Sequence, residues 1–248
     1  MDGRDFIINN VKVSIREGSW LEKVKLSLEE VIEFIYLWSH EYTNQQIKHE
    51  LNMSEKTVVE WSKCMREFCE VDLIENSEPI GGQDIECEID ESKFGKRYYN
   101  KGHRVEGQWV FGGREKLDKS KVFMVPVDDR KAKTLLPIIK QWIKKGSIIH
   151  SDCWKSYSKL GSSGYKHLTV NHSITFKDKT SGACTNGIEC DWRYAKRSIP
   201  SSGVHKGYHQ GYLAEFMWRR KNEGKDLFLE TFKMLNTFSS HNFISLPV

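Results

Sequence analysis

The sequence predicts an α/β domain with a mixed, helix-flanked β-sheet, preceded by a small all-α domain. Two changes of pattern along the chain lead to this prediction. Apolar residues recur at helical spacing from Leu26 to residue 74, and after residue 85 they alternate at strand spacing. The later part then alternates strands with helices, which favours one sheet covered by helices. A turn-rich stretch at 75–84, ENSEPIGGQD, separates the two patterns and is expected to be a linker.

The composition is that of a globular chain with a mild preference for polyanionic partners. The 248 residues hold 38 Lys and Arg against 34 Asp and Glu, which gives a net charge of +4. We find neither an apolar run of membrane-spanning length nor a charged-then-apolar leader, so we expect a soluble, intracellular protein with no membrane partner. The six cysteines form no Cys-x-x-Cys pair and are expected to be reduced thiols.

The first domain, residues 26–74, is expected to contain three helices. Its helical pattern is interrupted at Tyr42-Thr43-Asn44 and again at Asn52-Met53-Ser54. Thr43 or Asn44 can cap the second helix, and Ser54 can cap the third. Residues 1–25 precede this pattern as an N-terminal arm without a strong period.

This layout is typical of a helix-turn-helix, whose last helix can enter the major groove of DNA. The third helix carries cap, turn and basic positions together, which favours DNA binding over a plain helical bundle, the alternative interpretation. The DNA-binding candidates on it are Lys56, Thr57, Lys63 and Arg66.

The second domain is predicted to begin with three antiparallel strands. IECEID alternates apolar and acidic residues and ends at Asp90, and two further β-rich runs follow, GQWVFGGRE and KVFMVPVDD. KTLLPIIKQWIKKGS then predicts an amphipathic helix with Pro137 in its first turn and Gly146 at its end.

The later elements complete the sheet. SIIHSDCW predicts a strand that ends at Asp152, HLTVNHS predicts another, and TNGIECDWRYAKRS opens a helix. The ribonuclease H-like fold has this element order. We therefore assign the ribonuclease H-like domain to 85–223 and a C-terminal tail to 224–248.

Three carboxylates can meet in such a sheet: Asp90 and Asp152 at strand ends, and Glu189 in the first turn of the late helix. Three acids make the hard, oxygen-rich site that Mg²⁺ prefers, with Mn²⁺ as a substitute. Two such ions would serve phosphodiester attack. The alternative is that acids fall at strand ends by chance, and that Glu189 only favours the helix dipole.

Several stretches resemble the catalytic domain of Merlin-superfamily DNA transposases, DDE-type enzymes similar to bacterial insertion-sequence transposases. The resemblance covers roughly residues 16 to 220 and includes IDESKFGKRYYNKGHRVEGQWVFGG, SDCWKSY, TNGIECDWRYAKRSIP and GYLAEFMWRR. It implies a ribonuclease H-like fold with Asp90, Asp152 and Glu189 as the metal-binding triad. One departure is that no Cys-x-x-Cys pair precedes Trp20, where similar transposases often carry a cysteine-rich segment.

The resemblance also implies partners and further site residues. Similar enzymes often have a lysine at the position of Lys196, where an ammonium group could hold a DNA phosphate; a solvated base is the alternative. Arg193 and Arg197 are the DNA-binding candidates on the same helix. The expected partner is double-stranded DNA, both terminal inverted repeats and target, handled by a homodimer or larger homo-oligomer in the nucleus.

Three rival interpretations remain at this point. A host-adopted descendant would bind DNA without catalysis, and a metal-dependent ribonuclease H-like nuclease would act without the helix-turn-helix. A zinc site formed by His167, His172, Cys184 and Cys190 is disfavoured because their spacings contain no tight ligand pair.

Overall fold

The computed structural model describes residues 5–8, 11–14, 16–95, 107–152, 155–170, 184–200, 204 and 206–237. The chain divides into two compact units. The helical unit comprises residues 1–72 and 224–248, and the sheet unit comprises residues 73–223. Among the described helices, none is both long and apolar enough to cross a membrane.

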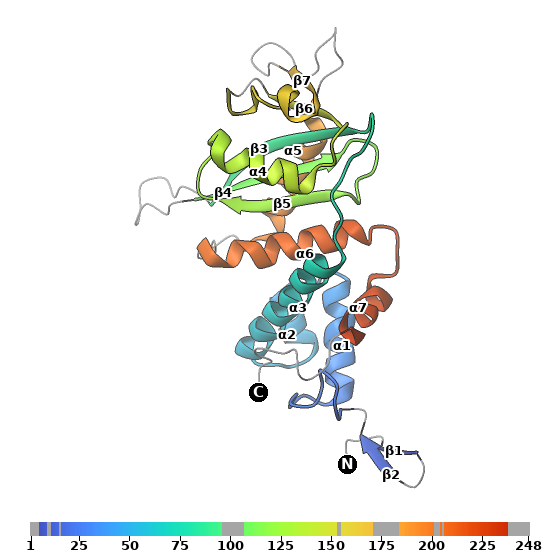
Figure 1. Cartoon of the computed structure of the whole chain (residues 1–248). Helices are drawn as coiled ribbons and strands as arrows, with labels where there is room; N and C mark the ends of the chain where they lie inside the picture. The colour runs from blue at the N-terminus through green and yellow to red at the C-terminus, as the bar shows by residue number, and fades with distance from the viewer. Residues whose placement is uncertain are drawn as a thin grey trace, which may run out of the picture. The chain divides into compact units, whose positions relative to one another are not determined.

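The helical unit contains the three helices that the sequence predicts: α1 (Leu28–Ser39), α2 (Asn44–Glu50) and α3, which begins in it and spans Glu55–Asn76 (Figure 1). Thr43 forms a capping box at the start of α2, and Ser54 Oγ accepts from the Thr57 N–H at the start of α3. Asn52 takes a positive φ of 49° in the turn between them. The predicted helix boundaries and caps are thus confirmed.

The segments at the two ends of the chain hold more structure than an arm and a tail. Strands β1 (Asp5–Ile8) and β2 (Val11–Ser14) form an antiparallel pair, and α7 spans Leu227–Asn236. The ring of Phe228 on α7 meets Tyr36 of α1 edge-on at 5.5 Å. Trp20, from the REGSW motif, is buried and meets Phe68 of α3 edge-on at 6.1 Å. The contact between Trp20 and Phe68, both buried, extends the core of the helical unit.

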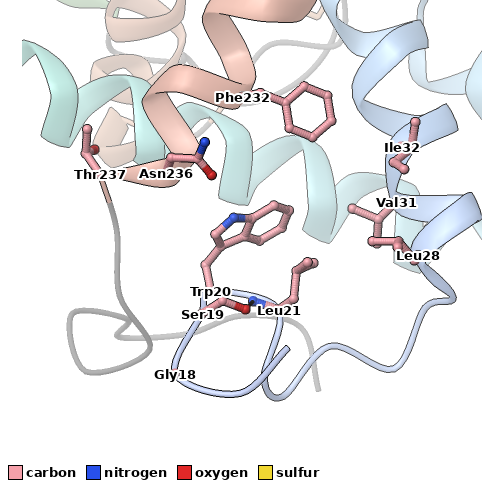
Figure 2. A pocket seen from close by; sticks show the side chains of 10 residues that line it. All are labelled: Gly18, Ser19, Trp20, Leu21, Leu28, Val31, Ile32, Phe232, Asn236 and Thr237. Atoms are coloured by element: carbon pink, nitrogen blue, oxygen red, sulfur yellow. Dashed lines mark hydrogen bonds between the residues drawn. The ribbon is translucent and has the colours of Figure 1, made fainter. Parts of the chain in front are cut away.

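A cavity of about 570 Å³ lies inside the helical unit. Figure 2 shows its lining side chains, which come from the 18–21 segment, α1 and the end of the α7 region: Gly18, Ser19, Trp20, Leu21, Leu28, Val31, Ile32, Phe232, Asn236 and Thr237. The REGSW motif therefore has a packing role in this unit.

The sheet unit is built on five strands in the order β5-β4-β3-β6-β7. Their bounds are β3 (Glu86–Phe94), β4 (Gln108–Glu115), β5 (Val122–Val127), β6 (Ile148–Asp152) and β7 (Lys166–Val170). β3, β4 and β5 pair antiparallel, whereas β6 runs parallel to β3 and β7 runs parallel to β6. This is the ribonuclease H-like arrangement that the sequence predicts.

Helices cover both faces of this sheet (Figure 1). On one face α4 (Ala132–Trp142) buries Leu135 and Ile139 against Ile89, Phe111 and Ile149. On the other, α5 (Asn186–Ser198) and α6 (His209–Lys221) contribute Ile188, Trp192, Leu213 and Phe216 to a second core that includes Val110 and Met124. Because successive side chains of a strand point to opposite faces of the sheet, the apolar residues of these strands are divided between the two cores.

The bounds of β3 and both ends of α4 differ from the sequence prediction. β3 does not end at Asp90 but continues to Phe94, because its pairing with β4 continues to Phe94 and Gln108. Pro137 lies inside α4 and not in its first turn, because α4 already begins at Ala132, and the helix ends at Trp142, before Gly146. Asp129 Oδ1 favours this early start, since it accepts from the Lys131 N–H and the Thr134 hydroxyl.

A buried ion network ties α5 to the sheet and to α6. Asp191 of α5 accepts from the Arg114 guanidinium of β4 at 3.1 Å and from the Arg220 guanidinium of α6 at 2.8 Å. The Asp191 side chain is only 1% exposed. Burial raises the pKa of Asp191, and the two guanidinium groups oppose that rise. The network stays charged because each carboxylate oxygen has a cationic partner.

We predict that Asp191→Asn destabilises the sheet unit by about 3–5 kcal/mol, because it removes the ion-pair partner of the buried Arg114 guanidinium and one of the two carboxylate partners of Arg220. Urea denaturation followed by tryptophan fluorescence measures this loss. Glu78→Gln is the matched control, since it breaks an exposed ion pair with Lys144 in the same unit and should cost less than about 1 kcal/mol. Equal losses of unfolding free energy in the two variants would contradict a stabilising role for the Asp191 ion network.

Candidate active site

Strand β3 and helix α5 are joined by three polar contacts at regular intervals, here called the β3–α5 ladder. The ladder comprises the Ile188 N–H donating to Glu88 Oε2 at 2.8 Å, the Trp192 Nε1–H donating to Asp90 Oδ2 at 3.0 Å, and Lys196 Nζ donating to Ser92 Oγ at 2.7 Å. Alternate strand residues advance about 6.6 Å and every fourth helix residue about 6 Å, so the two elements keep step over three contacts.

The first contact anchors the start of α5. Glu88 is 2% exposed, and its carboxylate accepts from the N–H groups of Gly187 and Ile188. Burial raises the pKa of Glu88, while these N–H groups and the Arg114 guanidinium oppose the rise. A carboxylate from the sheet thus satisfies helix N–H groups that have no partner within the helix.

Gly187 makes this close approach feasible. A Cβ at this position would lie 2.6 Å from Glu88 Oε2. The absence of a side chain therefore lets the sheet carboxylate reach the first turn of α5, the turn that carries Glu189.

The second contact holds Asp90, the half-buried acid of β3. Gly112 pairs with Asp90 across β3 and β4, and a Cβ there would lie 2.6 Å from the Trp192 ring, so the glycine makes room for that indole. Burial raises the pKa of Asp90 to about 6, and the negative charges of Asp152 and Glu189 add to the rise. The carboxylates of Asp152 and Glu189 therefore each lie within electrostatic reach of Asp90.

Asp152 lies at the last position of β6, as the sequence predicts. The residue before it fixes the backbone there: Ser151 Oγ donates to the Asp152 carbonyl oxygen at 2.8 Å and lies 2.8 Å from His167 Nε2. Because a hydroxyl has one proton to donate, the His167 nitrogen is the donor in the second contact. These two contacts restrain the backbone at Ser151 and Asp152, the last two residues of β6.

Glu189 lies in the first turn of α5, also as predicted. The Thr185 hydroxyl donates to Glu189 Oε1 at 2.9 Å. Asn186 is already the first helical residue, and the sheet carboxylate of Glu88 accepts from N–H groups of the first turn. Thr185 therefore orients the Glu189 carboxylate, and Glu88 holds the first turn of α5 in place.

Lys196 belongs to the same site, since its ammonium group contacts Ser92 and lies 5.3 Å from the centre of the Phe94 ring. Desolvation lowers the pKa of Lys196, and the Asp90 carboxylate opposes that effect. A cation thus stands beside the acids without a direct ion pair to Asp90.

Asp90, Asp152 and Glu189 do not by themselves form a metal site in this structure. Within the described residues, no three His, Cys, Asp or Glu side chains are arranged closely enough to enclose a metal ion. Mg²⁺ is commonly held by one or two carboxylates together with water and substrate phosphates, and it does not require an all-protein cage. Burial, and to a smaller extent the charges of Asp152 and Glu189, raise the pKa of Asp90, and a cation next to this carboxylate would favour its ionised form.

The predicted DNA-binding residues fall into two groups of different character. On α3, Lys56 pairs with Glu60 at 3.8 Å and Lys63 pairs with Glu67 at 3.3 Å, while the Thr57 hydroxyl lies 2.7 Å from Ser54 Oγ. Arg66, the fourth candidate on α3, is partly buried. Acids therefore partly neutralise the basic positions of this helix.

The two parts of the chain also differ in charge. Residues 26–74 hold 4 Lys and Arg against 10 Asp and Glu, whereas residues 75–223 hold 27 against 18. On α5, Arg193 and Arg197 are exposed, and the Arg197 guanidinium lies 5.8 Å from the centre of the Tyr194 ring. Non-specific attraction to phosphates is therefore expected mainly from residues 75–223.

A family comparison assigns the second domain of the chain. Residues 75–221, more than half of the chain, match the model of the ISXO2-like transposase domain. The chain belongs to this family. The match contains Asp90, Asp152, Glu189 and Lys196, and it confirms the resemblance to transposases that the sequence motifs indicated.

A curated relative supports the same assignment. An uncharacterized transposase-like protein of Haemophilus influenzae is 37% identical over 105 residues, which are 42% of this chain and 84% of the relative. Solved structures of Mos1 match more remotely. The strand transfer complex shows 10% identity with a TM-score of 0.24 over 84% of this chain and 77% of that chain. The paired-end complex with the left transposon end shows 9% identity with a TM-score of 0.27 over 82% and 78%. Because both scores are low, the fold assignment rests on the strand order.

For this transposase-family chain, sequence reasoning missed the residues that support the triad. Glu88 and Gly187 hold α5 in place, and Trp192, which is buried in the second core, donates to Asp90. The glycine in TNGIE, Gly187, is the sequence feature that could have indicated a close approach of another strand to the start of this helix. Of the disfavoured zinc set, Cys184 lies 3.9 Å from Glu88 Oε1, and His172 falls outside the described residues.

We predict that Gly187→Ala displaces the first turn of α5 and destabilises the sheet unit by about 1–3 kcal/mol, because its Cβ would collide with Glu88. Gly161→Ala is the control, since a Cβ there meets no atom within 4 Å. Thermal unfolding of both variants measures the difference. Unfolding of Gly187→Ala at the control temperature would show that the close approach is not required.

Proposed function

We propose that this chain is a metal-dependent DNA transposase that cuts strands at element ends and joins their 3′-hydroxyls to target DNA. The observation that supports the proposal is that Asp152 at the end of β6 and Glu189 in the first turn of α5 both lie within electrostatic reach of Asp90 on β3. Because the chain belongs to a transposase family, we interpret this arrangement of acids as the site of DNA cleavage and joining.

The residues have distinct proposed roles. Asp90, Asp152 and Glu189 would hold Mg²⁺, or Mn²⁺ in its place. When bound, such ions activate a water or a 3′-hydroxyl and stabilise the leaving oxygen. Lys196 would bind a DNA phosphate next to the acids, since its ammonium group already stands beside Asp90.

The proposed partners are terminal inverted repeats and target DNA. The α3 candidates Lys56, Thr57, Lys63 and Arg66 would read the repeat, while Arg193 and Arg197 would hold phosphates near the acids. Because two element ends must be handled together, we propose a homodimer or larger homo-oligomer. Eukaryotic DNA as the substrate would require the nucleus.

We predict that Asp152→Asn abolishes DNA cleavage and leaves DNA affinity within about twofold, because it removes a metal-binding charge at the end of a strand without removing a basic residue. The assay uses a labelled duplex that carries the terminal repeat, with Mg²⁺, Mn²⁺ or EDTA. Glu78→Gln, on an exposed pair in the same unit, is the matched control and should cleave normally.

The outcomes separate the rival functions. Cleavage at the element boundary that Asp152→Asn retains would contradict the triad assignment. Binding without cleavage in every metal would favour a DNA-binding protein without catalysis. Cleavage confined to an RNA–DNA hybrid would favour a ribonuclease H-like nuclease.

We predict that the double variant Arg193→Ala/Arg197→Ala weakens DNA binding at all sequences and reduces the slope of log K against log salt by about 2, because two exposed phosphate-binding charges are removed. Fluorescence anisotropy over a salt series measures this slope. Lys56→Ala should change the slope less, since Glu60 already offsets the Lys56 charge. An unchanged slope in the double variant would place the phosphate contacts elsewhere.

A further inference from the structure

The strands that carry Asp90 and Asp152 separate before they reach these residues. The parallel pairing of β3 with β6 covers Glu86 to Glu88 and stops at the pair of Glu88 with His150. Asp90 and Asp152 would form the next pair on the same face, two residues further along both strands. The ladder of hydrogen bonds between β3 and β6 therefore does not itself fix the separation of the two carboxylates.

A side-chain hydrogen bond spans this opening from the opposite face of the sheet. The hydroxyl of Tyr157 donates to Glu91 Oε1 in a short hydrogen bond. Glu91 directly follows Asp90 on β3, and Tyr157 ends the short helix η1 (Lys155–Tyr157) that follows β6. The bond therefore links the residue next to one acid with the segment that continues from the other.

The tyrosine is well placed to act as a fixed support. Tyr157 is fully buried, and its ring packs in the core that contains Ile89 and Ile149 of the same two strands. Its ring also meets the His167 ring edge-on at 6.4 Å, and His167 contacts Ser151, the residue before Asp152. Core packing and the Glu91 bond together hold the chain on both sides of Asp152.

Glu91 keeps this position at an electrostatic cost. Its carboxyl group is largely desolvated and close to Asp90 and Asp152, and these effects raise the pKa of Glu91 to about 7. The Tyr157 hydroxyl and the Arg130 guanidinium oppose the rise. Arg130 is itself held over the Trp109 ring at 4.1 Å from its centre. The hydrogen bond from the Tyr157 hydroxyl explains why Glu91 lies close to the negative charges of Asp90 and Asp152.

We propose that Glu91 and Tyr157 are positioning residues whose hydrogen bond sets the separation of the Asp90 and Asp152 carboxylates, and thereby the affinity of the site for a divalent cation. The inference rests on the proposed function, because it takes these two acids to be metal-binding. Neither Glu91 nor Tyr157 needs to touch the metal or the DNA in this role.

The test is Mn²⁺ binding to the intact protein, measured by electron paramagnetic resonance without DNA. Tyr157→Phe removes only the hydroxyl, and we expect its dissociation constant for Mn²⁺ to rise roughly 10-fold. Tyr165→Phe is the matched control: its hydroxyl donates to the Ile143 carbonyl oxygen at 2.9 Å in the same core, and its loss should leave Mn²⁺ binding unchanged. Circular dichroism melting checks that both variants are folded.

A second variant separates positioning from direct ligation. Glu91→Gln keeps an oxygen that accepts from Tyr157 but removes the charge, so we expect it to bind Mn²⁺ more tightly than Tyr157→Phe does. A larger loss in Glu91→Gln than in Tyr157→Phe would overturn the proposal, because it would make the Glu91 carboxylate itself a ligand. Wild-type affinity in Tyr157→Phe would overturn it as well.

DNA cleavage by the wild-type protein, assayed in parallel, distinguishes this inference from the proposed function. Mn²⁺ binding that weakens in Tyr157→Phe, in a wild-type protein that cuts no DNA, would support the positioning role and contradict the transposase chemistry. If the wild-type protein cuts DNA in a metal-dependent way but the Tyr157→Phe variant binds Mn²⁺ normally, the result would contradict the positioning role and support the transposase chemistry. A wild-type protein that binds no Mn²⁺ overturns the inference in either case.

Discussion

The candidate site depends on one constraint: helix α5 must lie along strand β3 in a fixed register. The buried carboxylate of Glu88 provides the anchor, since it accepts from the Gly187 and Ile188 N–H groups. From that point the matched spacings of strand and helix bring Trp192 to Asp90 and Lys196 to Ser92. The first turn that holds Glu189 is thereby placed near the acids of the sheet.

The charges around this ladder fall into two classes with opposite consequences. Asp191 is neutralised by Arg114 and Arg220, and Glu88 by N–H groups and Arg114, so these buried acids hold α5 in place. Asp90 and Glu91 instead lie on opposite faces of β3, and burial together with nearby negative charge raises the pKa of both carboxyl groups. Raised pKa values of this kind are typical of functional sites, whereas the structural acids are matched by cationic or N–H partners that hold α5.

The sequence predicted the order of strands and helices along the chain, the helix caps at Thr43 and Ser54, and the places of Asp152 and Glu189, because these follow from local periodicity and turn chemistry. It predicted the end of β3 wrongly, since the polar run after Asp90 does not alternate clearly and pairing with β4 decides its length. The roles of Glu88 and Tyr157 were not predictable, because each contacts a residue far along the chain. Alternation shows which face a side chain occupies, but not which partner it meets there.

The central claim is that Asp90, Asp152 and Glu189 form one metal-binding site. The most direct measurement is an anomalous-scattering map from crystals of the protein soaked in Mn²⁺. We expect a peak in contact with the carboxylate oxygens of Asp90 and Asp152, and its loss in crystals of Asp90→Asn. Peaks that lie only away from these three residues, or a peak at the site that persists in Asp90→Asn, would contradict the claim.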